Sequence, residues 1–120
     1  MQFNHIDLGV SDVIAAATFF ERHFDFTLDQ VMVNDSRAIL DGATGESLVL
    51  THQPDPVTYP KNFHIGFLVS DERVVHDKHA ELTAAGIDGI SPIREMRGGV
   101  LFYCTAPGGV LVEVGHRPGR

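Results

Sequence analysis

The chain contains an internal repeat, because a segment of eight residues occurs twice. Residues 5–12, HIDLGVSD, align without gaps on residues 64–71, HIGFLVSD, and five of the eight positions are identical. In each copy apolar residues alternate along a strand-like stretch, and the Ser-Asp pair then precedes a helix-like stretch. An internal repeat is stronger evidence of architecture than the structural propensities of single segments. We therefore expect two copies of one supersecondary unit.

Each copy is expected to contain a strand, a helix and three further strands. The expected helices cover residues 13–24 and 72–85, and the strands that follow them cover 27–33, 37–41, 47–52, 89–94, 99–105 and 110–115. The predicted fold class is α+β. We expect a single domain over residues 1–120, with a first βαβββ module at 1–52, a linker at 53–62 and a second module at 63–116.

Charge and composition exclude several classes of function. Nine Lys and Arg against 16 Asp and Glu give a net charge of −7, which argues against binding to nucleic acid or to an anionic membrane. The sequence shows neither a signal peptide nor a long apolar run, so the expected location is the cytoplasm. The single cysteine, Cys104, excludes a cysteine-based zinc cluster, so any metal ligands must be His and carboxylate side chains.

Three residues stand on the polar side of strands that are otherwise apolar. Strand alternation turns His5 and His64 away from the apolar face of the repeated strand, and Glu113 away from the valines of VLVEV. A buried carboxylate needs a proton, a cation or a metal. If the two modules curve round a shared cup, these three side chains meet, and two imidazoles with one carboxylate are typical of a metal site.

The alternative for each of these residues is a structural role. A single histidine on a strand face is more often a surface or hydrogen-bonded residue than a ligand, and it is the repetition that favours a metal site. The helix histidines are expected on solvated faces, and the histidines that follow strand ends are candidates for the cup mouth. These residues are His23, His76 and His79 on helices, and His52 and His116 after strands.

The chain resembles the vicinal-oxygen-chelate superfamily, which includes glyoxalase I, bleomycin and fosfomycin resistance proteins and type I extradiol dioxygenases. The resemblance is carried by FNHIDLGVSD, FHIGFLVSD and the closing hairpin FYCTAPGGVLVEVG. It implies a cup-shaped, barrel-like mixed sheet with the helices outside. It also places His5, His64 and Glu113 at three positions from which the family takes metal ligands.

Differences from individual members narrow the prediction. Val49 stands where glyoxalase I has a fourth ligand, which leaves the two-His-one-carboxylate set of Fe(II) oxygenases. Fosfomycin-resistance transferases share the three ligands, but Asp7 replaces their Thr, and residues 95–100 lack the Lys and Ser that hold a phosphonate. The closing hairpin most resembles type I extradiol dioxygenases, including Tyr103 ten residues before Glu113.

The resemblance therefore implies an extradiol ring-cleavage dioxygenase that acts on a catechol-like small molecule. One divalent metal is expected, Fe(II) before Mn(II), Zn(II) or Ni(II), and the protein is expected to be a homodimer whose ligands come from one chain or from two. Tyr103 would contact substrate oxygen, and Glu46 or His52 would donate a proton. Asp7 would orient a ligand imidazole or bond backbone at the rim. The residues expected to line the substrate pocket are Asp7, Val49 and Leu111.

The resemblance leaves two alternative functions open. One is a binding or resistance protein that sequesters an aromatic or peptide-like molecule without chemistry. The other is a glyoxalase-type or epimerase-type enzyme, in which a metal-polarised carbonyl loses a proton to a carboxylate.

Overall fold

The computed structural model describes residues 1–54 and 57–119, which form two compact units. The first unit comprises Met1–Thr58 with Pro107–Gly109, and the second comprises Tyr59–Ala106 with Val110–Arg120. The elements of the first are β1 (His5–Val10), α1 (Val13–His23), β2 (Thr27–Val31), a 3₁₀ turn (Val33–Asp35), β3 (Arg37–Asp41) and β4 (Ser47–His52). Those of the second are β5 (His64–Leu68), α2 (Glu72–Ala84), β6 (Arg94–Met96), β7 (Gly99–Thr105) and β8 (Leu111–His116).

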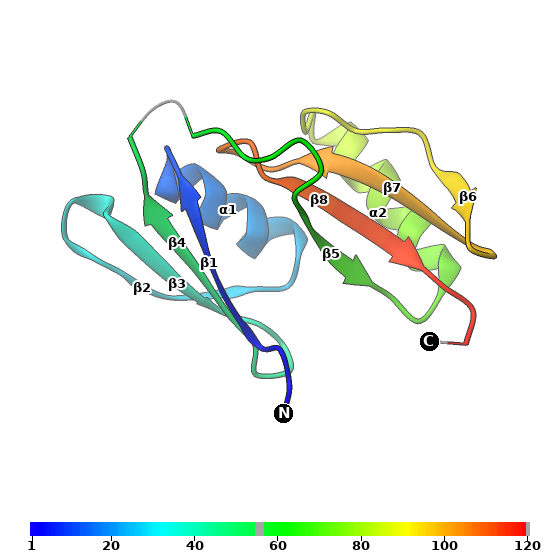
Figure 1. Cartoon of the computed structure of the whole chain (residues 1–120), viewed down its shortest axis with the longest axis horizontal. Helices are drawn as coiled ribbons and strands as arrows, with labels where there is room; N and C mark the ends of the chain where they lie inside the picture. Colours follow the sequence, from blue (N-terminus) through cyan, green and yellow to red (C-terminus); the bar gives the residue numbers. More distant parts are fainter. Residues whose placement is uncertain (55–56, 120) are drawn as a thin grey trace. The chain divides into compact units, whose positions relative to one another are not determined.

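The strands form two mixed sheets of four with the same topology (Figure 1). Their orders are β1-β4-β3-β2 and β5-β8-β7-β6. In each sheet the first strand of the unit runs parallel to the last strand, and the other neighbours are antiparallel. The predicted α+β class with two βαβββ modules is therefore confirmed.

The repeated Ser-Asp pair begins both helices in the same way. The Asp12 carboxylate accepts a hydrogen bond from the backbone N–H of Ala15 at 3.0 Å, and the Asp71 carboxylate accepts one from Arg73 at 2.9 Å. These bonds satisfy backbone donors that the first turn of a helix leaves unpaired. Of the two residues that the sequence offers as caps, the aspartate is used in each copy.

Each helix packs on one face of the sheet of its own unit. α1 buries Phe20, and α2 buries Val75 and Leu82. Among the described helices none is both long and apolar enough to cross a bilayer. The apolar face of each sheet lies under its helix and forms the core of that unit. The largest fully buried side chains include Leu8, Leu40 and Leu50 in the first unit and Phe102, Val112 and Val114 in the second unit.

One residue on the buried face of α1 differs from the expectation. His23, expected on a solvated face, is 7% exposed and lies tilted against Phe19, with 5.8 Å between the ring centroids. The buried residues Ala16, Phe20 and His23 are spaced at three and four positions, as one helical face requires. The prediction was wrong because the His23 ring packs against the aromatic ring of Phe19, as a core side chain does.

Two strand boundaries also differ from the expected ones. β2 ends at Val31 rather than at residue 33, because Asn34 and Asp35 turn the chain with φ of 58° and 54°. β6 covers Arg94–Met96 rather than 89–94. The preceding segment runs beside β7 and is held by Ser91, whose hydroxyl accepts the Tyr103 N–H at 2.9 Å, and Pro92 cannot donate to a strand ladder there.

Candidate functional site

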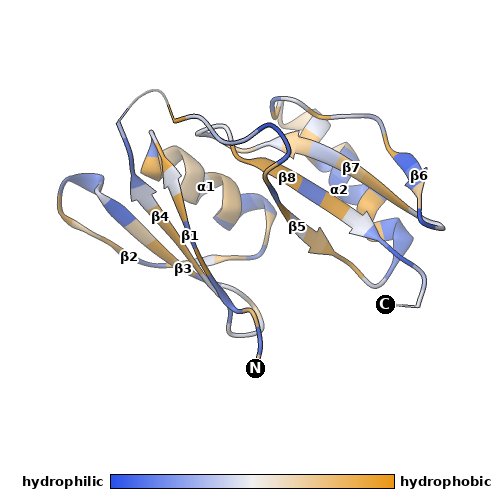
Figure 2. Ribbon diagram, viewed as in Figure 1, coloured by the Kyte–Doolittle hydropathy of each residue, from blue (hydrophilic) through white to orange (hydrophobic). Residues whose placement is uncertain are grey.

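The carboxylate of Glu113 lies at the centre of the open face of the second sheet. Its cross-strand partners are Gly66 on β5 and Tyr103 on β7, and the whole residue is only 7% exposed. Figure 2 shows a hydrophilic band within β8, which is otherwise mainly hydrophobic. Gly66 has no side chain, so the hydrogen bonds that stabilise the buried carboxylate must come from β7 and from other residues near β8.

Tyr103 supplies one of the hydrogen bonds that Glu113 needs. Its phenol donates to Glu113 Oε1 at 2.9 Å. Burial raises the pKa of Tyr103, as do the hydrogen bond to Glu113 and the charge of that carboxylate, whereas Arg94 and Arg117 oppose the rise. The phenol is therefore protonated at neutral pH and remains a donor to Glu113.

His64 approaches the same carboxylate oxygen from β5. Its Nε2 atom lies 3.8 Å from Glu113 Oε1, and its Nδ1 atom lies 3.0 Å from the carbonyl oxygen of Asn62. A carbonyl can only accept, so a neutral His64 carries its proton on Nδ1 and turns the Nε2 lone pair toward Glu113. The His64 ring also stands edge-on to the Tyr103 ring, with 5.6 Å between the centroids, which fixes its orientation.

Glu113 and His64 fit the donor set of a divalent metal. Metal-bound histidines commonly donate their second N–H to a backbone carbonyl, as His64 does here, and a carboxylate with one imidazole suits Fe, Mn, Zn or Ni. Within residues 1–54 and 57–119 no three His, Cys, Asp or Glu side chains converge as a metal site. The structure thus brings together Glu113, His64 and Tyr103, while His5 lies exposed on β1 of the first unit, opposite Ser47.

The first unit has a different set of residues at the equivalent strand positions. Asp7 pairs with Val49 across β1 and β4, as Gly66 pairs with Glu113 across β5 and β8. Val49 is 7% exposed, so an apolar side chain occupies the place that the carboxylate has in the second unit.

Asp7 is held by a side chain that the sequence prediction missed. Its Oδ1 atom accepts a hydrogen bond from the Thr51 hydroxyl at 2.6 Å, and Thr51 accepts one from Arg37 Nε at 3.2 Å. Within the first unit, Asp7 therefore contacts a hydroxyl rather than an imidazole. The alternation of β4, which puts Thr51 on the same face as Val49, is the signal that identifies this contact.

Three other predicted site residues lie in different settings. Glu46 belongs to the turn before β4, where the Thr44 hydroxyl donates to its carboxylate; this hydrogen bond lowers the pKa of Glu46 and keeps the group ionised at neutral pH. His52 is exposed at the end of β4. Leu111 is half-buried opposite His64 in the β5–β8 ladder, so it is the apolar neighbour of the candidate metal ligands.

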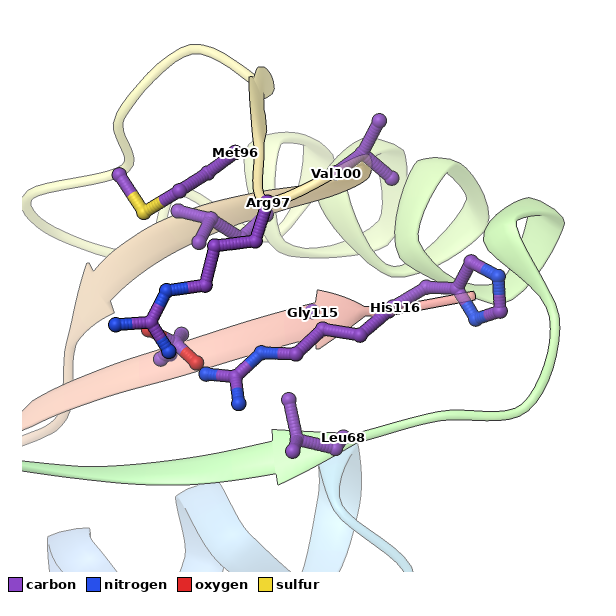
Figure 3. Close-up of a pocket in the computed structure, with 9 residues that line it drawn as sticks. Leu68, Met96, Arg97, Val100, Gly115 and His116 are labelled. Atoms are coloured by element: carbon purple, nitrogen blue, oxygen red, sulfur yellow. The ribbon is translucent and has the colours of Figure 1, made fainter. Parts of the chain in front are cut away.

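Arginines around Glu113 were also missed by the sequence prediction. Arg97 and Arg117 line a pocket with Glu113, and the guanidinium carbon of Arg94 lies 5.9 Å from the centroid of the Tyr103 ring. Figure 3 shows Arg97 reaching from the turn after β6 toward β8, with Leu68 rising from β5. The remaining pocket residues are Met96, Val100, Leu101, Gly115 and His116.

Comparisons with known proteins give one family. Residues 2–114 match the model of the Glyoxalase/Bleomycin resistance protein/Dioxygenase superfamily. No curated protein matches the chain. A solved structure described as a possible glyoxalase from Bacillus cereus is 32% identical, with a TM-score of 0.84, and the match covers 95% of this chain and 97% of that one.

More distant structures share the fold. Lactoylglutathione lyase from Agrobacterium tumefaciens is 18% identical with a TM-score of 0.78, over 96% of this chain and 92% of that one. The fosfomycin resistance protein FosX from Listeria monocytogenes is 19% identical with a TM-score of 0.81, over 97% and 93%. Because the family model matches residues 2–114, the chain belongs to the glyoxalase/bleomycin resistance protein/dioxygenase superfamily.

Proposed function

We propose that this protein is a metal-dependent enzyme acting on a small molecule with two neighbouring oxygen atoms, and that it cleaves a catechol-like ring beside its hydroxyl groups. The observation that supports the metal site is the Glu113 carboxylate, 7% exposed, with Tyr103 donating to Oε1 and the Nε2 atom of His64 3.8 Å from the same oxygen. A buried anion that faces the lone pair of a neutral imidazole is stabilised when a cation binds between them.

The repeat supports His5 as the third ligand. His5 occupies in β1 the position that His64 occupies in β5, on the strand face opposite the helix. We propose that His5 joins His64 and Glu113 as the third ligand, supplied by the same chain or by the partner chain of a homodimer. Val49 leaves the set at three, which favours the open site of an Fe(II) oxygenase over a four-ligand glyoxalase site.

Each residue has a stated part in this function. When bound, the divalent ion, Fe(II) before Mn(II), Zn(II) or Ni(II), supplies Lewis acidity that lowers the pKa of substrate hydroxyl groups. His5, His64 and Glu113 would hold it, and Tyr103, which donates to Glu113, would keep that carboxylate oriented and present its phenol oxygen to the substrate. Leu111 lies opposite His64 and offers an apolar surface to a ring.

Two residues of the first unit are also part of the proposed substrate site. Asp7, which the Thr51 hydroxyl holds, and Val49 would contact the substrate. Glu46 is a poor proton donor because its pKa is lowered. His52 is therefore the residue that we propose as the proton donor.

A second candidate is a glyoxalase-type lyase or isomerase. It is favoured by the 32% identity to the structure described as a possible glyoxalase. In that reaction the carbon next to the metal-polarised carbonyl of the substrate would lose its proton to a carboxylate. We rank this candidate second because position 49 is a valine, which cannot supply the fourth metal ligand of glyoxalase I.

The test is metal analysis of the purified protein, followed by activity measurements with and without oxygen. Stoichiometric iron and a yellow ring-cleavage product from catechols in air, both lost in Glu113→Ala, support the dioxygenase. Oxygen-independent isomerisation of a thiohemiacetal with Ni(II) or Zn(II) would instead establish the second candidate. Ligand binding that needs no metal, without turnover of either substrate, would contradict both and indicate a binding or resistance protein.

A further inference from the structure

Three guanidinium groups surround the Glu113 site on the second sheet. Arg97 and Arg117 line the pocket that contains Glu113, and Arg94 lies over the Tyr103 ring. The chain carries nine Lys and Arg residues and has a net charge of −7. A third of its basic residues thus gather at one site of an acidic protein, which is an unusual local concentration of positive charge.

The strand register explains how the arginines reach this face. Arg94 pairs with Leu101 in the β6–β7 ladder, and paired residues point to the same side of a sheet. Leu101 is two positions before Tyr103, so Arg94 shares the face of Tyr103 and Glu113. Arg117 follows the last residue of β8 directly, and its charge acts on the Tyr103 phenol together with that of Arg94.

The backbone at Arg97 is unfavourable for an arginine. Arg97 and Gly98 form the two-residue turn between Met96 and Gly99, with φ of 54° and 75°. A turn with two positive φ values favours Asn, Asp or Gly at its first position. A longer L side chain there costs about 1 kcal/mol, so turn formation does not account for an arginine at this position.

Among the residues that the structure describes, the three arginines form no ion pair with a carboxylate. Glu113 is the single acidic residue that lines their pocket. Glu72 and Glu95 border a separate hollow with Arg97. In the part of the chain that the structure describes, none of the three guanidinium groups has a carboxylate oxygen within 4.0 Å. Within the pocket itself, the single carboxylate of Glu113 stands beside the two guanidinium groups of Arg97 and Arg117, which leaves an excess of positive charge there.

We propose that Arg94, Arg97 and Arg117 form a subsite for an anionic group of the substrate, a carboxylate or a phosphate. Guanidinium groups bind such oxygens through paired N–H donors, and they retain their charge at all physiological pH values. The pocket holds about 10 Å³, close to the space of one water molecule. That space is too small to enclose a carboxylate or a phosphate, so the anionic group would lie at the mouth of the pocket against the exposed Arg94 and Arg97, while the rest of the substrate lies over Tyr103.

This inference extends the proposed function and rests on it. The proposed function requires a substrate with two neighbouring oxygen atoms that bind the metal. The arginines indicate that the same substrate also carries a carboxylate or phosphate, which would lie toward the β6–β7 turn. A ring that bears both groups would be held at two points, which fixes its orientation.

The subsite is tested by calorimetric titration at low salt with benzoate, with inorganic phosphate and with the uncharged analogue benzamide. The variant is Arg97→Asn with Arg117→Gln, because asparagine suits the turn and the fold is therefore retained. We expect one of the two anions to bind the wild-type protein, benzamide not to bind, and the double variant to bind that anion at least about tenfold more weakly. Preference for benzoate or for phosphate identifies the group.

Two controls separate this inference from the proposed function. Arg73→Gln removes an exposed arginine on α2 and is expected to bind the anion like the wild type. His64→Ala is expected to lose metal and keep the anion. The inference is overturned if neither anion binds, if Arg73→Gln weakens binding as much as the double variant, or if His64→Ala loses the anion, which would place it on the metal. Unchanged metal content in the double variant supports a separate subsite.

Discussion

The Tyr103 phenol donates a 2.9 Å hydrogen bond to Oε1 of Glu113, a carboxylate that the surrounding sheet buries almost completely. Tyr103 and Glu113 are direct cross-strand partners, so sheet register fixes their separation. The bond holds one carboxylate oxygen in place beside His64. The orientation of Glu113 therefore depends on a side chain of the neighbouring strand as well as on β8.

Tyr103→Phe is expected to weaken metal binding while the fold is retained. The substitution keeps the ring against His64 and removes the donor to Glu113. Loss of a hydrogen bond that orients a ligand costs roughly 10-fold to 100-fold in metal affinity. Competition with a chelator measures this change, and Tyr59→Phe, on the segment before β5, is the matched control. Equal affinity in both variants would show that Tyr103 does not position Glu113.

The ionisation of Tyr103 is expected to destabilise the protein at alkaline pH. Its pKa is raised from 10.0 by burial and by Glu113, so the folded state holds this proton more tightly than the unfolded chain does. The resulting stabilisation is complete below the unfolded pKa and is lost as pH rises through the folded pKa. Absorbance titration of the Tyr59→Phe variant, in which Tyr103 is the remaining tyrosine, should give a midpoint above 10.0. A midpoint at or below that value would contradict the burial of this hydroxyl.

Glu113→Gln is expected to remove metal binding without unfolding the protein. The amide oxygen of the glutamine can still accept the hydrogen bond from Tyr103. Because the amide is neutral, the cost of burying a charged carboxylate is removed. We expect the free energy of unfolding of the metal-free variant to stay within about 1 kcal/mol of the metal-free wild type. Metal analysis and denaturant titration give the two values. Retention of full metal content would exclude Glu113 as a ligand.

Cys104 is expected to be unreactive in the folded protein. It is fully buried on β7, and burial raises the pKa of its thiol to about 11. Since the thiolate is the reactive form, labelling with a thiol reagent at neutral pH should require opening of the second unit. The labelling rate should rise steeply with denaturant. Rapid labelling without denaturant would contradict the packing of β7 against α2.

The order of helices and strands could be predicted because the same pattern occurs twice in the sequence, so each copy supports the interpretation of the other. Alternation in the repeated strand, and in VLVEV, correctly separated the helix-covered face from the face of His64 and Glu113. The prediction failed for His23, whose burial depends on packing between α1 and its sheet rather than on polarity. β6 was misplaced because a bond from Tyr103 to Ser91, distant in sequence, holds the segment before it.

The candidate site was predictable only in part, for a related reason. Glu113 and His64 stand out as polar residues on apolar strands, but Arg94 and Arg97 lie in a polar segment where nothing local marks them. Their relation to Glu113 arises from the pairing of β6 with β7 and of β7 with β8. Likewise, Thr51 becomes a partner of Asp7 through the register of β1 with β4.

The central claim is that His64 and Glu113 hold a divalent metal, and the metal content of freshly purified His64→Ala tests it most directly. His76→Ala, an exposed histidine on α2 that lies 3.4 Å from Glu72, is the matched control. We expect the wild type and His76→Ala to contain about one metal ion per site, and His64→Ala to contain almost none while it unfolds as cooperatively as the wild type. Full metal content in a folded His64→Ala protein would contradict the claim.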